Sequence, residues 1–442
     1  MNRLFLLAAA LLVAAAPAGA AYEIRIATDA EDWHAAIGQT VTYRVSLLED
    51  GRPVVGQKLQ YTLSWDYIVP IRKGEITSAA EPVELTGLAT HPGFMRLDVH
   101  YQPAEGKAVD EPASVAVAPR QIHSPVTEPD DFDAFWESKK QLVLAEPMNP
   151  QLTPVDSQME NFEIFDLQIN CPGVKPCSGY FGRPTNAKPG TLPAVLFVHS
   201  AGVWSSWINA VRQAGRWGDV LAYDLNAHGI PNGHDRPFYE ALDAGELKGY
   251  PFQGIEDRET DYFLGMYMRI IRAIQFLTSQ PEWDGKNLVV IGGSQGGGQA
   301  IVAAGLDPRV TLVLVRLPAL ANQTGFLAGQ PAGWPRTVFR GNVEYCPINE
   351  YDEQVADVSR YFDAVNFARR CHAEIVIAVG FVDHTCPPTS IYGMFNAMPS
   401  EHKTIIDFPR VGHFHNTKPV EERMQRVAEE CIQRLCEPAA GQ

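Results

Sequence analysis

A serine within a short glycine-rich segment has the setting of a catalytic nucleophile. Residues 292–296 read GGSQG around Ser294; an apolar stretch at 288–291 precedes them, and a helical pattern starts at Gln295. Between a strand and a helix, a G-x-S-x-G segment forms a sharp turn that raises the serine hydroxyl above the sheet edge, and its glycines permit close backbone approach. The alternative is an ordinary glycine-rich turn. The strand before the serine and the helix after it favour a nucleophile.

A serine nucleophile needs a base, and the base needs a carboxylate that fixes its tautomer. When the serine occupies a turn of this kind, the acid and then the histidine follow it along the chain. Asp383 comes just after the strand expected at 374–379, and His413 comes just after the strand expected at 404–408. Order and placement therefore predict a catalytic triad of Ser294, Asp383 and His413.

Other titratable residues compete for the two later roles. His384 follows Asp383 directly and cannot easily turn back to it across a loop. Asp407 alternates within a strand, which favours a place on the face of a sheet. His415 is the serious alternative to His413 as the base.

Two backbone N–H groups are needed to hold the negative charge that develops on the attacked carbonyl oxygen. Gln295, the residue after the nucleophile, supplies one of them. The other is expected from the loop after the strand at 193–199, where we choose Ala201. Trp204 and Trp207 follow this loop and are weaker candidates for substrate contact, because they could equally be core residues of the next helix.

These candidates are carried by alternating strands and helices, which are typical of a parallel α/β sheet. The apolar run at 193–199 is typical of a central strand that is covered on both faces. Residues 21–118 instead contain short alternating strands, typical of a small Ig-like β-sandwich. The sequence therefore predicts a doubly wound, mostly parallel sheet in a catalytic domain at 161–442. The all-β sandwich (21–118) and a linker with a packing helix (119–160) precede it.

Several further segments occur in the same order as in a known family. They are residues 131–136 (DFDAFW), 292–297 (GGSQGG), 306–310 (LDPRV), 361–366 (YFDAVN), 380–388 (GFVDHTCPP) and 412–413 (GH). With them, the chain from about Asp130 to Leu435 resembles the acetyl xylan esterase / cephalosporin-C deacetylase family of α/β-hydrolases. Several separate motifs in the right order are far more specific than G-x-S-x-G alone.

The resemblance implies an α/β-hydrolase fold and a serine esterase that removes acetyl groups from carbohydrate without a cofactor. It also implies that Ser294, Asp383 and His413 occupy the triad positions, and that Gln295 and Ala201 occupy the oxyanion positions. Family members often oligomerise, so the resemblance leaves a homo-oligomer open, although the added N-terminal domain could block it.

We therefore expect an exported serine carboxylesterase that deacetylates xylan-like carbohydrate through an acyl-enzyme. Better-known family members carry His-Gly-Tyr where residues 199–201 read His-Ser-Ala. This change keeps a backbone donor but removes a tyrosine from the pocket wall. The resemblance therefore implies the mechanism, but not the acyl and sugar specificity to the same degree. One alternative is a secreted serine peptidase of the prolyl-oligopeptidase kind. Another is a non-catalytic carbohydrate-binding protein on a hydrolase scaffold, against which the intact Ser, Asp and His argue.

The first residues predict export to the periplasm or the medium. Arg3, an apolar run at 4–16 and the small residues at 18–20 are typical of a signal peptide (1–20) rather than of a membrane span. No cysteine follows the apolar run, so no lipid anchor is expected. The formal net charge of −16 disfavours nucleic acid and anionic membranes as partners and leaves neutral sugar esters open.

The seven cysteines are an odd number, so at least one thiol is free or pairs between chains. Cys171 and Cys177 flank a turn-rich loop and are the best disulfide candidate. The family resemblance favours reduced, buried thiols at Cys371 and Cys386. No cluster of cysteine and histidine has zinc spacing, so no metal is expected.

Aromatic residues give the β-sandwich two interpretations. Trp33, Trp65 or Tyr67 could stack on sugars, which would make the sandwich a carbohydrate-binding module. Aromatic side chains are mostly buried, however, and Trp65 lies in an alternating strand. A packing or spacing domain with these residues in its core is therefore favoured.

Overall fold

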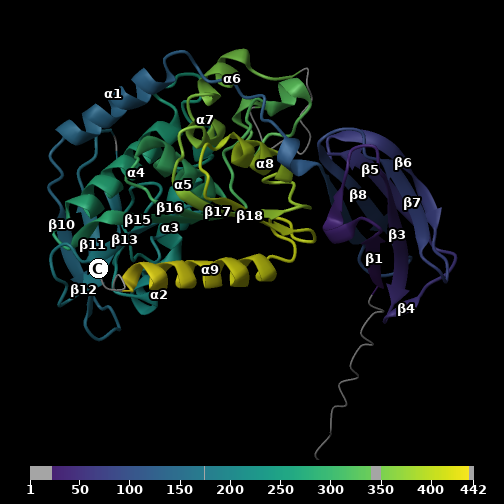
Figure 1. The fold of residues 1–442 in the computed structure, drawn as a ribbon, viewed down its shortest axis with the longest axis horizontal. Helices are drawn as coiled ribbons and strands as arrows, with labels where there is room; N and C mark the ends of the chain where they lie inside the picture. Colours follow the sequence, from purple (N-terminus) through teal and green to yellow (C-terminus); the bar gives the residue numbers. More distant parts are fainter. Residues whose placement is uncertain (1–21, 174, 340–349, 438–442) are drawn as a thin grey trace, which may run out of the picture.

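The computed structural model describes residues 22–173, 175–339 and 350–437 and consists of a β domain beside a larger α/β domain (Figure 1). The expected signal peptide at 1–20 lies outside the described residues. Within the described part of the chain, no helix is long and apolar enough to cross a membrane.

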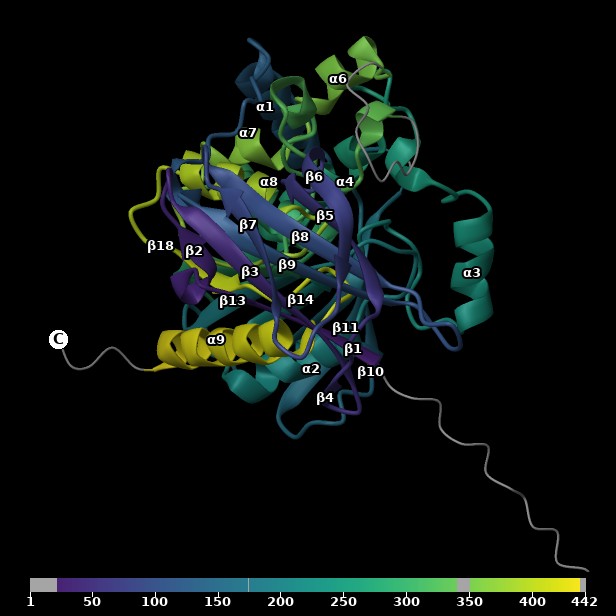
Figure 2. The same ribbon diagram turned by 90° about the vertical axis from the view of Figure 1, so that its right-hand side faces the viewer.

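Two sheets form the β domain (Figure 2). One sheet contains β1 (Tyr22–Thr28), β3 (Thr40–Glu49), β4 (Arg52–Pro53) and β7 (Val83–Leu88). The other has the order β2 (His34–Ala35), β9 (Val109–Val117), β8 (Gly93–Tyr101), β5 (Lys58–Trp65) and β6 (Val69–Thr77). Alternate residues of β3, including Val41, Tyr43 and Val45, are buried in a shared apolar core, as the period of two along a strand requires.

A nine-stranded sheet is the centre of the α/β domain. Its order is β10 (Gln151–Val155), β11 (Phe162–Ile169), β12 (Cys177–Pro184), β14 (Leu221–Leu225), β13 (Leu192–Val198), β15 (Trp283–Gly293), β16 (Leu312–Arg316), β17 (Glu374–Gly380) and β18 (Lys403–Phe408). The pairs from β10 to β14 are antiparallel, and those from β14 to β18 are parallel. The sheet already begins at β10, within the stretch that the sequence assigned to a linker.

Helices cover both faces of this sheet, which confirms the doubly wound α/β-hydrolase architecture (Figure 1). One face carries α1 (Phe132–Ala145), α4 (Tyr262–Ser279), α5 (Gln295–Leu306), α7 (Ala364–Ala368) and α8 (Pro388–Ala397). The opposite face carries α2 (Ile208–Trp217) and α9 (Lys418–Cys436). The remaining helices are α3 (Arg236–Ala244), α6 (Glu353–Ser359) and the short 3-10 turns η1 (Glu31–Trp33), η2 (Pro119–Gln121), η3 (Tyr250–Phe252), η4 (Gly325–Ala328) and η5 (Thr337–Phe339).

The β domain packs directly against the end of the α/β sheet. Phe94 of β8 contacts Phe381, with ring centroids 5.1 Å apart, and the buried Asp66 carboxylate accepts a hydrogen bond from the Thr389 hydroxyl. Trp65 is a core residue of the β domain at 6% exposure, as expected for the packing interpretation. Tyr67 differs from that expectation, because its hydroxyl contacts the α/β domain.

The predicted disulfide between Cys171 and Cys177 is wrong, because both residues are free thiols in the structure. Cys177 starts β12 and is fully buried, with its sulfur 3.3 Å from the Tyr223 hydroxyl beneath the sheet. The side chain is thus satisfied in the core and does not close the loop. Cys371 and Cys386 are free and buried, as the family resemblance implied.

Candidate active site

Ser294 occupies the turn between β15 and α5. Its backbone has φ 53° and ψ −123°, a conformation that costs energy in a residue other than glycine and that recurs at functional sites. The turn brings α5 against β13 so tightly that a Cβ atom at Gly296 would lie 2.2 Å from the Val198 carbonyl oxygen. Only glycine can occupy position 296 without moving the backbone, so the glycines of the motif have a steric role.

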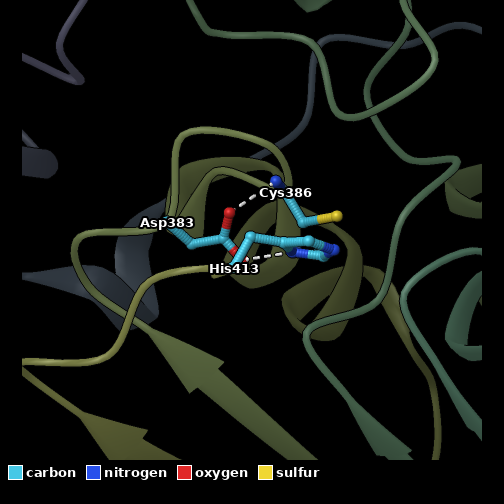
Figure 3. A group of neighbouring side chains, drawn as sticks. All are labelled: Asp383, Cys386 and His413. Carbon is cyan, nitrogen blue, oxygen red and sulfur yellow. Dashed lines mark hydrogen bonds and ion pairs between the residues drawn. The ribbon is translucent and has the colours of Figure 1, made fainter. Parts of the chain in front are cut away.

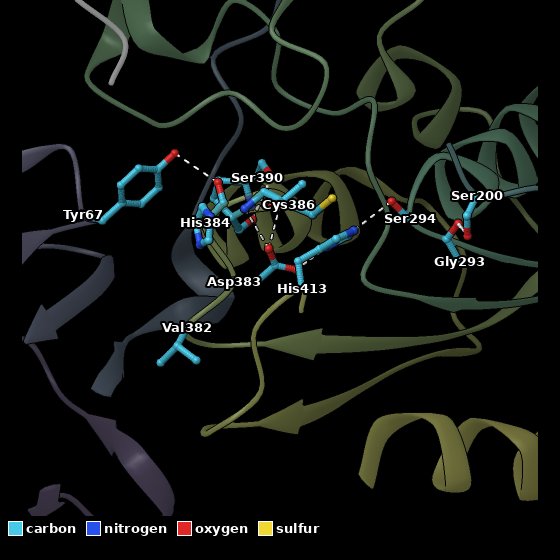
Figure 4. A network of polar contacts seen from close by, with 12 residues as sticks. Tyr67, Ser200, Gly293, Ser294, Val382, Asp383, His384, Cys386, Ser390 and His413 are labelled. Carbon is cyan, nitrogen blue, oxygen red and sulfur yellow. Dashed lines mark hydrogen bonds and ion pairs between the residues drawn. The ribbon is translucent and has the colours of Figure 1, made fainter. Parts of the chain in front are cut away.

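Ser294, His413 and Asp383 form one hydrogen-bonded chain (Figure 4). The Ser294 Oγ lies 2.9 Å from the His413 Nε2, and the His413 Nδ1 lies 2.8 Å from the Asp383 Oδ2. The second carboxylate oxygen of Asp383 accepts the backbone N–H groups of Thr385 and Cys386, both at 2.8 Å. Because Asp383 is fully buried and its oxygens are occupied, the carboxylate holds the imidazole in one orientation.

The charge state of His413 reflects opposing effects. Burial lowers the pKa of the imidazole, whereas the hydrogen bond and the charge of the Asp383 carboxylate raise it, so that its net pKa lies above the usual value of 6.5. Since a carboxylate on Nδ1 stabilises the imidazolium, this arrangement favours proton uptake from Ser294.

The competing residues lie elsewhere. His384 and His415 are exposed, and the carbonyl of His415 accepts the Gly412 N–H. Asp407 accepts a hydrogen bond from the Tyr392 hydroxyl at 2.6 Å and lies 3.2 Å from the His34 Nε2 in the β domain. None of the three is part of the hydrogen-bonded chain at Ser294.

Within the described ranges, one group of side chains has the spacing of a metal site: Asp383, Cys386 and His413 (Figure 3). Two of its members, Asp383 and His413, belong to the hydrogen-bonded chain just described. The Asp383 carboxylate and the His413 Nδ1 are hydrogen-bonded to each other, and burial raises the pKa of the Cys386 thiol, which disfavours the thiolate that metals require. The absence of a metal therefore stays a prediction.

The loop after β13 lies beside the serine, as the oxyanion role requires. The Ser200 hydroxyl donates to the Gly293 carbonyl at 3.0 Å, which ties this loop to the turn at Ser294. Among the residues the structure describes, neither the N–H of Ala201 nor that of Gln295 has an acceptor. Gln295 begins α5, where the N–H groups lack partners within the helix and carry the positive end of its dipole. Both are thus available to bind an anionic oxygen.

Buried side chains that the sequence analysis missed hold this loop in place. The Tyr250 hydroxyl donates to the Gln295 side-chain oxygen at 2.6 Å and accepts the Gly202 N–H. His228 contacts the Gly202 carbonyl at 2.9 Å through Nε2, and burial lowers its pKa to about 4, so the ring is neutral. The only signal in the sequence was a segment with polar residues, DLNAH at 224–228, at the end of a strand.

A pocket of about 670 Å³ opens above Ser294 and is lined by Ala201, Trp204 and His413. The Trp204 ring folds over Gly202, where φ is 124° and a Cβ would lie 1.8 Å from the ring. Trp204 thus fills space beside Ala201. Trp207 is half-exposed and lines a neighbouring crevice between α2 and α9 instead. The structure therefore brings Trp204, but not Trp207, to the pocket at Ser294.

Two side chains of the β domain form hydrogen bonds with the loop that carries Asp383. The Arg96 guanidinium donates to the Val382 carbonyl at 2.9 Å. The Tyr67 hydroxyl donates to the His384 carbonyl at 3.3 Å (Figure 4). These carbonyls flank Asp383 on both sides. Arg96 is only 11% exposed and also forms an ion pair with Asp98 at 2.8 Å. The β domain thus positions the acid of the chain at Ser294.

Replacing Arg96 by alanine should lower kcat on p-nitrophenyl acetate by about 10-fold with little change in KM, because the Asp383 loop loses an anchor and a small displacement of reacting groups is costly. Arg96→Lys should restore part of the loss. The control is Arg44→Ala, which removes an exposed ion pair with Glu84 on the other sheet. Equal kcat values in Arg96→Ala and the wild-type protein would contradict this positioning role.

A parallel sheet with a serine at the turn after a central strand, hydrogen-bonded to a histidine, defines the class of α/β-hydrolases. The family model for acetyl xylan esterase (AXE1) matches residues 120–430. The acetyl esterase Axe7A of Xylanibacter ruminicola is 30% identical over 386 residues, which cover 85% of this chain and 83% of the relative. The chain belongs to the acetyl xylan esterase family and is a carboxylic ester hydrolase.

Solved structures of the family have the same fold. An acetyl xylan esterase from Paenibacillus sp. R4 is 27% identical with a TM-score of 0.58, covering 71% of this chain and 98% of its own. Acetyl xylan esterase 1 from Thermoanaerobacterium sp. is 22% identical with a TM-score of 0.54, covering 70% and 97%. The match to Axe7A is longer than the family model, so it includes part of the β domain.

Proposed function

We propose that this protein is an exported esterase that removes acetyl groups from carbohydrate, such as acetylated xylan or xylo-oligosaccharides, with Ser294 as nucleophile. The hydrogen-bonded chain from Ser294 Oγ through His413 to Asp383 supports the proposal most directly. Export is inferred from the signal-peptide pattern at 1–20. The acetylated carbohydrate is inferred from membership of the acetyl xylan esterase family and from similarity to the acetyl esterase Axe7A.

The reaction proceeds in two halves through an acetyl-enzyme. His413 Nε2 takes the proton of the Ser294 hydroxyl while the oxygen attacks the acetyl carbonyl carbon, and the N–H groups of Gln295 and Ala201 hold the oxyanion. His413 returns the proton to the sugar oxygen, the ester bond breaks, and the deacetylated sugar leaves. Water, deprotonated by His413, then attacks the acetyl carbon; the bond to the Ser294 oxygen breaks, His413 returns the proton to that oxygen, and acetate leaves. No cofactor enters these steps.

Acetate release from a panel of acetylated xylo-oligosaccharides tests this function. We expect turnover of these esters, labelling of Ser294 by a fluorophosphonate probe, and no cleavage of prolyl anilides. Cleavage of prolyl anilides with acetyl esters untouched would indicate a serine peptidase instead. Binding of the sugars without any acetate release or probe labelling would indicate a non-catalytic carbohydrate-binding protein.

Acyl-chain preference should depend on Trp204. In a tight pocket each added methylene costs about 1–3 kcal/mol, so kcat/KM should fall along p-nitrophenyl esters from acetate to octanoate. Trp204→Ala should open the space beside Ala201 and raise the butyrate-to-acetate ratio by about 10-fold. The comparison variant is Trp207→Ala, which does not line this pocket but stacks on Trp204 with ring centroids 6.4 Å apart, so it should change the ratio less than Trp204→Ala does.

A wild-type protein that turns over butyrate or octanoate faster than acetate would refute the deacetylase function. A ratio that changes in Trp207→Ala but not in Trp204→Ala would show that the wrong tryptophan had been assigned to the pocket.

A further inference from the structure

A groove of about 870 Å³ runs between the β domain and the loops that follow β17 and β18. Its wall on the catalytic side includes His384, His413 and Phe414, and the same three residues line the pocket above Ser294. Groove and pocket are therefore neighbours, with His384, His413 and Phe414 in the wall of both. This volume lies within the range of small-molecule and cofactor sites, so the groove can hold a small-molecule ligand beside the pocket at Ser294.

The wall on the other side is the outward face of the five-stranded sheet. Strand register places two rows of polar residues across it. One row is Lys73, Thr62, Asp98 and Pro112, and the other is Glu75, Gln60, His100 and Asp110. The inward residues Leu59 and Leu63 of the same strand are buried in the sandwich core. The rows are thus held rigidly on a packed sheet and offer a dense set of donors and acceptors.

Each carboxylate of these rows lies against a basic side chain. Asp98 pairs with Arg96 at 2.8 Å, Asp110 lies 2.7 Å from His100, and Glu75 pairs with Lys58 at 2.7 Å. Paired charges offer little net attraction to an ionic ligand, and the protein as a whole carries a net charge of −16. A ligand that is neutral and rich in hydroxyl groups fits this wall, because it can hydrogen-bond to both signs of charge.

Phe414 marks the place where the groove meets the pocket. It is 84% exposed, and its ring centroid lies 4.9 Å from that of His413. None of the residues that the structure describes buries this ring, so its apolar face is exposed between the groove and the pocket. A sugar ring has an apolar face that can cover such a side chain.

We propose that this groove binds the neutral sugar chain that extends from the acetylated residue, so that the β domain contributes the chain-binding part of the substrate site. The inference rests on the proposed function. It makes the protein selective for acetylated oligosaccharides and polysaccharides over acetylated monosaccharides. It also accounts for the β domain and the active-site loops sharing one surface.

The test compares kcat/KM for acetate release from acetylated xylohexaose and acetylated xylobiose. In the wild-type protein we expect the longer substrate to be preferred at least tenfold, mainly through KM. Thr62→Trp fills the groove and should remove most of this preference. The matched control is Thr86→Trp, an exposed threonine on β7 of the other sheet, which should keep the preference. If Thr62→Trp does not fold, the double variant Gln60→Ala/His100→Ala, which deletes groove donors, should also reduce the preference.

Three outcomes would overturn the proposal: equal kcat/KM for both lengths, an unchanged preference in the groove variants, or stronger inhibition by an oligogalacturonate than by unacetylated xylohexaose. These results differ from failure of the proposed function. Hydrolysis of p-nitrophenyl acetate with no acetate released from either sugar would refute the proposed function, whereas equal release from both lengths would refute the groove alone.

Discussion

Ser294→Ala should abolish ester hydrolysis, with kcat on p-nitrophenyl acetate falling by about 10³- to 10⁶-fold while the protein remains folded. The hydroxyl lies 2.9 Å from the His413 Nε2, whereas the Ser200 hydroxyl, which also lines the pocket, donates to the Gly293 carbonyl instead. The strained backbone conformation at position 294 should change little in the variant, because alanine keeps the Cβ atom. Steady-state rates and thermal unfolding of the variant measure the two effects separately.

The histidines give this prediction a matched control. His413→Ala should lose nearly as much activity as Ser294→Ala, because the proton of the serine then has no acceptor. His415→Ala should retain most activity, since His415 is exposed and stands outside the hydrogen-bonded chain. Wild-type turnover in Ser294→Ala, or a larger loss in His415→Ala than in His413→Ala, would reverse the assignment.

Asp383→Asn should lower kcat by about 10⁴-fold without a large change in KM. An amide in place of the carboxylate removes the acceptor that fixes the proton on the His413 Nδ1, so the base is held in the wrong tautomer. The two backbone N–H groups that now bond to Asp383 keep an oxygen partner in the amide, so the loop should retain its shape. Asp407→Asn is the control, because that carboxylate bonds to Tyr392 rather than to His413.

The same variant should move the titration of His413. The base acts only when neutral, so in the wild-type protein kcat/KM should rise with pH as His413 loses its proton, with a midpoint above 6.5. Since the Asp383 charge raises this pKa, Asp383→Asn should shift the midpoint to lower pH, as measured by NMR titration of the imidazole. A midpoint that rises in the variant, or equal losses in Asp383→Asn and Asp407→Asn, would contradict the proposed role of Asp383.

The parts of the molecule that obey local patterns could be predicted from the sequence. The apolar run at 193–199 became β13, the turn at Ser294 lies between β15 and α5, and Asp383 and His413 follow strands whose ends meet at one edge. Hydrophobic periodicity predicted the strands, and chain order predicted which residues would meet, so the three side chains could be brought together without knowledge of the packing.

Long-range contacts could not be predicted in this way. Nothing near Arg96 or Tyr67 in the sequence indicates that each bonds to a carbonyl of the loop 382–384, because that contact depends on how two domains pack. The predicted disulfide failed for a related reason. The spacing of Cys171 and Cys177 allowed a bridge, but the start of β12 directs Cys177 into the core toward Tyr223.

The central claim is that Ser294 is the nucleophile with which this protein removes acetyl groups from carbohydrate. The most direct measurement treats the protein with a fluorophosphonate, follows acetate release from acetylated xylo-oligosaccharides, and maps the adduct by peptide mass spectrometry. The account predicts a single adduct on Ser294 that forms in step with the loss of acetate release. Acetate release that persists in fully labelled protein, or inactivation with the adduct on another residue, would contradict it.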